Sequence, residues 1–75
     1  MERYKNLGGD SGIAGFEYGD DYIRVRVSDG AVYLYTYGSA GGRAIEDMKV
    51  LADRGEGLNA YINARVRKRY ARKER

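Results

Sequence analysis

The chain contains no cysteine and no histidine among its 75 residues. Without cysteine, no disulfide can staple a domain of this size and no thiolate can act as a nucleophile or metal ligand. Without histidine, the chain also lacks the usual proton carrier at neutral pH and the other common ligand of transition metals. Only carboxylates remain as ligands for a hard cation. These absences predict a protein that is not an enzyme, and we expect neither a metal nor another cofactor.

Long apolar runs are also missing. No segment approaches the roughly 18 apolar residues of a membrane-spanning helix, and the first residues hold no signal-peptide core. We therefore expect a cytoplasmic protein with no membrane partner. A chain of 75 residues makes one small domain with a thin core. Eight of its nine aromatic residues are tyrosine, which suits such a core because the ring packs while the hydroxyl stays in water.

Basic side chains are concentrated at one end. The residues from Arg65 to Arg75 hold seven of the fourteen bases and one acid, Glu74, which gives this segment +6 and the rest of the chain −3. A basic stretch that contains a tyrosine is typical of nucleic-acid binding, because each cation that neutralises a phosphate releases a counterion. The alternative is a solvated run that keeps the protein soluble. The predicted phosphate-binding residues are Arg65, Arg67, Lys68, Arg69, Arg72 and Lys73, with Tyr70 stacking among them.

Alternation of apolar and polar residues predicts three strands, at 13–18, 22–27 and 31–37. The clearest is 22–27, where three aliphatic residues share one face and Arg24 and Arg26 share the other. These two arginines could extend the basic patch or could simply face solvent. An Asp-Gly pair at 29–30 predicts a hairpin before the third strand.

A 3.6-residue period predicts two helices. The first spans 43–54, and the second begins near Leu58 with Leu58, Ile62 and Val66 on one face. Beyond Val66 bases surround the helix axis, so we expect that end to project or fray. The prediction is an α+β fold in which a three-stranded antiparallel meander precedes two helices packed on one face. Its parts are a flexible lead-in at 1–10, a folded domain at 11–66 and a basic tail at 67–75.

The third predicted strand is apolar on both faces, and Tyr33, Tyr35 and Tyr37 line one of them. These rings could stack on unpaired bases, as the sheets of RNA-binding modules do, or they could form the core under the helices. The sequence is therefore also compatible with a second function. The chain could be a protein-interaction or assembly module that uses an exposed strand edge or an uncovered tyrosine face.

The turn acids Asp20, Asp21 and Asp29 are too few for a calcium loop, and we expect them to bond local backbone. The glycine pairs at 8–9 and 41–42 lack the Lys-Ser/Thr that follows a phosphate-binding loop. Neither pattern predicts a ligand site.

Four segments in order resemble one known family. They are SerGlyIleAlaGlyPheGluTyr at 11–18, IleArgValArgValSerAspGlyAlaValTyrLeuTyr at 23–35, GlyLeuAsnAlaTyrIle at 57–62, and the basic segment with its tyrosine. Together they resemble the KTSC domain, a small module first noted at the C-terminal end of a lysyl-tRNA synthetase. The positions that carry the resemblance are Ser11, Ile13, Gly30, Val32, Tyr33, Tyr35, Gly57, Asn59, Ile62 and Tyr70.

The resemblance implies a small α+β module, alone or appended to nucleic-acid-related proteins, with a role in nucleic-acid binding. It also directs attention to two polar residues, Ser11 and Asn59. Either side chain could bind a ligand, but a residue near a helix start, such as Asn59, is more economically a cap or a backbone tie. The chain departs from the family pattern at Leu58, where an aromatic residue is usual.

Overall fold

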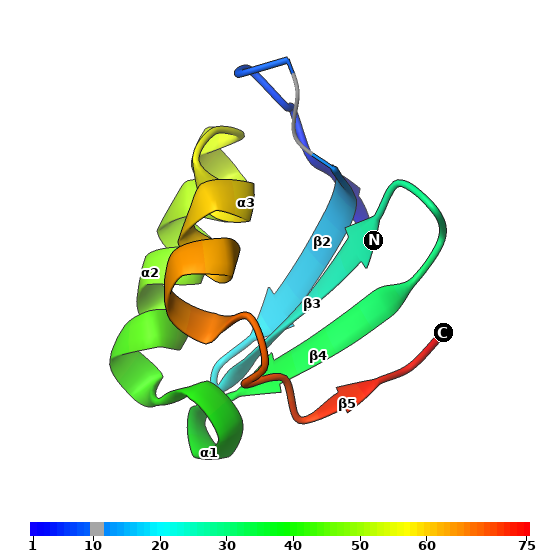
Figure 1. Cartoon of the computed structure of the whole chain (residues 1–75). Helices are drawn as coiled ribbons and strands as arrows, with labels where there is room; N and C mark the ends of the chain where they lie inside the picture. The colour runs from blue at the N-terminus through cyan, green and yellow to red at the C-terminus, as the bar shows by residue number, and fades with distance from the viewer. Residues whose placement is uncertain (10–11) are drawn as a thin grey trace.

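The structure is a computed structural model that describes residues 1–9 and 12–75. Within these residues an antiparallel sheet of five strands follows the order of the chain, and helices α2 and α3 lie against one of its faces (Figure 1). The strands are β1 (Glu2–Arg3), β2 (Ile13–Gly19), β3 (Tyr22–Val27), β4 (Val32–Thr36) and β5 (Arg72–Lys73). The helices are α1 (Tyr37–Ala40), α2 (Gly42–Arg54), α3 (Leu58–Tyr61) and a π-helical turn η1 (Ile62–Val66). The predicted α+β class is confirmed.

The three predicted strands form the middle of the sheet. β2 and β3 pair up to a tight turn at Gly19 and Tyr22, with a register shift between Ile13 and Gly15. The β3–β4 hairpin closes at Gly30, whose φ of +97° suits glycine and whose amide donates to the carbonyl of Val27 at 3.0 Å. The Asp-Gly signal therefore marks the turn correctly.

The core lies between the sheet and the helices. On the sheet side, Ile23 is opposite Tyr35 and Val25 is opposite Tyr33, so these four side chains share the face that the helices cover. The helices contribute Ile45, Met48, Ala52, Leu58 and Val66, all of which are buried. Each buried aliphatic side chain contributes about 1.5–3 kcal/mol to folding, so this one cluster supplies most of the drive for a domain this small.

Local chemistry sets the helix ends. α1 begins directly after β4 with a capping box, in which the Thr36 hydroxyl accepts from the Ser39 amide and the Ser39 hydroxyl accepts from the Thr36 amide. The third strand therefore ends at Thr36, one residue before its predicted end. α2 ends at Gly55, which has a left-handed φ of +78° and donates its amide to carbonyls of the last turn.

The second predicted helix is α3 followed by the wider turn η1. A π turn takes more residues per revolution than an α turn. Val66 therefore comes back to the side of the helix that carries Leu58, and both side chains are buried. The three residues between Ile62 and Val66, which include Asn63 and Arg65, are exposed to solvent.

Two expectations at the ends of the chain are wrong. The lead-in is not without structure, because Glu2–Arg3 forms β1 against β2 and Tyr4 is only 3% exposed within the core. The basic tail does not project, because its backbone pairs with β4 as β5. The amides of Ala71 and Glu74 donate to the carbonyls of Leu34 and Val32 at 2.6 and 2.7 Å. Docking through backbone hydrogen bonds needs no apolar stripe, which is why the side-chain pattern did not predict it.

Asp10 and Ser11 lie outside the described residues, so the structure does not test whether Ser11 binds a ligand. Among the residues described, no helix has both the length and the apolar character needed to cross a membrane.

Candidate nucleic-acid interface

Three arginines from three segments line one hollow of about 470 Å³. Arg43 comes from the first turn of α2, Arg65 from η1, and Arg69 from the segment after it. Tyr61 and Asp47 complete the charged and polar part of the lining. The packing of α2 against η1 is what brings Arg43, 22 residues away in the sequence, beside the predicted pair Arg65 and Arg69.

The one acid in this hollow already has partners. Asp47 Oδ2 lies 3.7 Å from Nε of Arg43 and accepts a hydrogen bond from the Tyr61 hydroxyl at 3.1 Å. Burial, together with this bond to Asp47, raises the pKa of Tyr61. The tyrosine therefore remains a neutral donor at physiological pH. Three positive charges against one negative charge leave the hollow suited to an anion.

The turn after η1 extends the positive surface. Arg67, Lys68 and Arg69 are exposed, and neither they nor Arg65 form an ion pair with any acid in the described part of the chain. We call Arg43, Arg65, Arg67, Lys68 and Arg69 the arginine cluster. Of the predicted phosphate-binding residues, Arg65 and Arg69 thus share the hollow, and Arg67 and Lys68 lie between them in the chain.

The remaining predicted tail residues, Tyr70, Arg72 and Lys73, form contacts within the sheet or with its side chains. The Tyr70 ring lies 4.9 Å from the Tyr33 ring and 6.3 Å from the Tyr35 ring, measured between centroids. Lys73 Nζ lies 5.9 Å from the centre of the Tyr33 ring, and Arg72 is paired with Glu74. Tyr70 therefore packs on the protein's own tyrosines, where the sequence had predicted stacking on a base.

Arg24 and Arg26 are not continuous with the arginine cluster. Both lie on the sheet face opposite the helices, and Arg24 is held between Glu17 at 3.1 Å and Glu74 at 2.8 Å. The hydrogen bond to Glu74 raises the pKa of Arg24 above its ordinary value. The structure therefore does not support the interpretation that Arg24 and Arg26 extend the basic patch.

Tyr33, Tyr35 and Tyr37 do not form a common platform. Tyr35 is 3% exposed in the core, where burial raises its pKa to about 12. Tyr33 is half-buried beside it. Tyr37 has left the strand to begin α1, and its hydroxyl donates to Glu46 at 2.6 Å. The core interpretation holds for Tyr35 and Tyr33, and β5 covers the edge of β4 that an assembly partner could have used.

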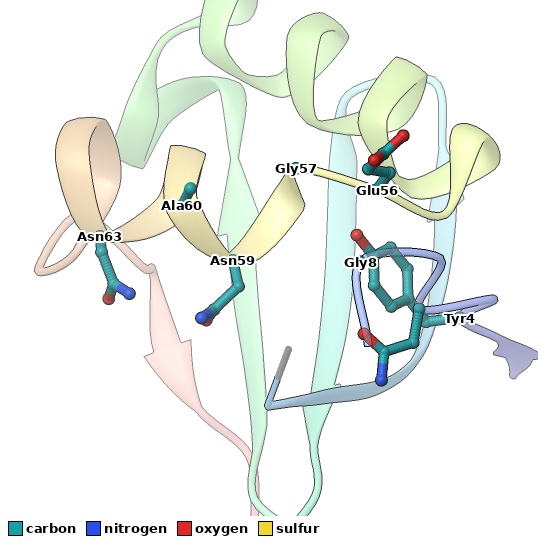
Figure 2. A pocket seen from close by; sticks show the side chains of 8 residues that line it. Tyr4, Gly8, Glu56, Gly57, Asn59, Ala60 and Asn63 are labelled. Atoms are coloured by element: carbon teal, nitrogen blue, oxygen red, sulfur yellow. The ribbon is translucent and has the colours of Figure 1, made fainter. Parts of the chain in front are cut away.

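A second hollow, of about 360 Å³, was not predicted (Figure 2). Its lining holds three side-chain amides and one hydroxyl, and consists of Tyr4, Asn6, Gly8, Glu56, Gly57, Asn59, Ala60 and Asn63. We call it the amide hollow. The available sequence signal was the four-residue spacing of Asn59 and Asn63, which places two amides on one helical face. The expectation that Asn59 caps the helix is wrong, because Gly57 is the N-cap and no side-chain bond is made there.

Of the three turn acids, Asp29 behaves as expected, since its Oδ1 accepts from the Ala31 amide at 3.0 Å. The side chains of Asp20 and Asp21 form no hydrogen bond to backbone within the described residues. Within residues 1–9 and 12–75, no group of three or more acidic side chains is arranged to hold a metal ion. Comparison of the chain with models of known protein families, with curated proteins and with solved structures gave no match.

Proposed function

We propose that this protein is a non-enzymatic module that binds single-stranded nucleic acid, RNA or DNA, through the arginine cluster. One observation carries the proposal. Arg65, Arg67, Lys68 and Arg69 lie within five residues of chain, are exposed, and have no acidic partner in the described structure.

Like charges so close together repel one another, and a polyanion relieves that repulsion while releasing its own counterions. The protein places Arg43 beside the same hollow, which adds a cation from a different element. A structural role for these side chains is not supported by their contacts, in contrast to Arg24 and Arg72, which are both paired with Glu74.

A single strand suits this surface better than a duplex. The cations are divided between a hollow of about 470 Å³ and an exposed turn, and a flexible strand can bend to place successive phosphates at both. The resemblance to the KTSC family stays a proposal, and the role that it implies agrees with this one.

The test is a fluorescence-anisotropy titration of the protein with labelled ten-nucleotide single-stranded RNA and with duplex DNA, at two salt concentrations. The wild-type protein is expected to bind the single strand more tightly, with affinity that falls steeply as salt rises. Each phosphate contact contributes about 0.7 to the slope of log affinity against log salt for single strands. An Arg65→Ala/Arg69→Ala variant should therefore bind more weakly, with a slope smaller by about 1.4.

The matched control is Arg3→Ala/Arg54→Ala. It removes the same charge from exposed arginines that lie outside the arginine cluster. Equal weakening in the two double variants would mean that only net charge matters and would contradict the proposed site. Absence of binding by the wild-type protein at low salt would end the proposal. Point variants are preferable to truncation, because removal of the tail would also remove β5 and Tyr70 from the sheet.

A further inference from the structure

The amide hollow combines two side chains from one helical segment with the N-terminal segment of the chain. Asn59 on α3 and Asn63 on η1 are four residues apart, and Figure 2 shows both side chains pointing from the helix to the same side. Tyr4 forms part of the opposite wall, where its hydroxyl accepts a hydrogen bond from the Leu58 amide at 3.3 Å. The hollow is therefore built from segments that only the fold brings together.

The amides of Asn59 and Asn63 are available to a ligand. Neither side chain hydrogen-bonds to any other group in the portion of the chain that the structure describes, and neither caps the helix. Asn59 is half-buried, so part of its hydration is already lost. A polar group in this position gains when a ligand supplies the missing hydrogen bonds.

Charge distinguishes this hollow from the arginine cluster. Among the described residues that line it, Glu56 is the one with a charge, so this lining offers no cation to attract a phosphate. Each carboxamide presents an acceptor oxygen and two N–H donors. The matching ligand is a neutral group with a donor and an acceptor side by side, which is the chemistry of a nucleobase edge.

The amide hollow and the arginine cluster lie along the same stretch of chain. Asn63 is four residues before Arg67, a spacing that places both side chains on one helical face, so a strand with a phosphate at Arg67 can reach the amides. Arg65, two residues after Asn63, points to a different side and lines the other hollow. Unpaired bases of a single strand have their edges free for such contacts. Asparagine pairs in bidentate fashion with N6 and N7 of adenine, and the Glu56 carboxylate can accept from an exocyclic amine.

We propose that the amide hollow, with Asn59 and Asn63 as its hydrogen-bonding residues, binds an unpaired adenine base of the strand that the arginine cluster holds by its phosphates. This inference rests on the proposed function and adds base preference to it. The arginine cluster supplies affinity that is independent of sequence, and the amide hollow supplies the discrimination between bases.

Two measurements test the inference. In the first, labelled decamers of A, C and U are titrated with wild-type protein, with Asn59→Ala/Asn63→Ala and with Arg65→Ala/Arg69→Ala at one salt concentration. The wild-type protein is expected to bind the A decamer about tenfold more tightly than the U decamer. The asparagine variant should lose that preference, whereas the arginine variant should weaken binding to all three oligomers and keep the ratio.

In the second, free adenosine or uridine is added to isotopically labelled protein while the side-chain NH₂ signals of Asn59 and Asn63 are recorded. Adenosine has no phosphate, so this readout does not depend on the arginine cluster. Movement of both signals with adenosine, and less with uridine, supports the site.

The outcomes separate the two proposals. Salt-dependent binding of all three decamers with equal affinity overturns the amide hollow as a base site and leaves the proposed function standing. Failure of every decamer to bind overturns the proposed function, and the adenosine titration then decides the amide hollow by itself. Unmoved asparagine signals at high adenosine overturn this inference in either case. Circular dichroism of each variant shows whether the fold is intact.

Discussion

Arg24 on β3 donates a hydrogen bond from Nε to Oε1 of Glu74 over 2.8 Å, across 50 residues of sequence. The same guanidinium donates from Nη1 to Glu17 on β2 at 3.1 Å. Glu74 is the one acid of the basic segment 65–75. Its ion pairs with Arg24 and Arg72 therefore help to hold this segment against the sheet, even though the basic side chains of the segment repel one another.

Replacement of Glu74 by glutamine should loosen β5. Partial burial would raise the pKa of Glu74, but hydrogen bonds from Arg24 and Arg72 outweigh it and hold the pKa below the ordinary 4.5. A carboxyl whose pKa is lowered by folding stabilises the fold above 4.5 and loses that effect as pH falls through the folded-state pKa. The protection of the Ala71 and Glu74 amides against hydrogen exchange, measured relative to the unfolded-chain rate at the same pH, should therefore fall in acid, and in Glu74→Gln it should already be low at pH 7.

The control for that experiment is Glu56→Gln, which removes an exposed acid that makes no ion pair in the described structure. Exchange at Ala71 should be unchanged in this variant. Equal exchange in both variants would show that the Glu74 pairs do not hold β5. The effect on the free energy of unfolding should be small, because the ion pairs are partly exposed to solvent.

Tyr70→Ala should destabilise the fold. The ring is 37% exposed and packs against the rings of Tyr33 and Tyr35. Loss of these contacts should lower the free energy of unfolding by about 1–2 kcal/mol, as measured by urea denaturation. Tyr70→Phe keeps the ring and should remain near wild type. A stable Tyr70→Ala variant would mean that the aromatic contacts contribute nothing and that β5 is held by its backbone alone.

Alkaline solution should unfold the protein through Tyr35. Burial raises the pKa of this hydroxyl from 10.0 to about 12. The neutral form is favoured in the folded state, so the stabilisation is fully present below pH 10 and is lost as pH rises toward 12. The free energy of unfolding should fall over that interval, and the tyrosinate absorbance should include a late step near pH 12 that is absent in Tyr35→Phe. In Tyr35→Phe the fall should be shallower, and an unchanged slope would assign the effect to other groups.

Gly55→Ala should be more damaging than Gly30→Ala. Both glycines have positive φ, so both substitutions carry the backbone penalty of about 1 kcal/mol. A Cβ at residue 55 would lie 2.5 Å from Cβ of Lys5, whereas one at residue 30 would have nothing within 4 Å. We expect an additional loss of about 1–3 kcal/mol for Gly55→Ala from this overlap, measured by urea denaturation. Equal losses would show that the segment at Lys5 moves aside freely.

Local patterns predicted the centre of this protein well. The alternation of 22–27, the Asp-Gly turn before β4 and the apolar stripe of α2 each depend on residues within a few positions of one another. The side-chain period is then enough to identify an element and its buried face. The concentration of bases near Arg65 and Arg69 could also be read directly, since charge is a property of composition.

Only the tertiary structure decided the rest. Whether β5 would pair with β4 depends on backbone amides and carbonyls, which are alike in every residue and leave no pattern in the sequence. The position of Arg43 beside Arg65, and that of Tyr4 beside Asn59, depends on how distant elements pack. The sequence by itself determined the elements and the sign of the charge, whereas packing of the helices and both chain ends onto the sheet determined which polar residues share a surface.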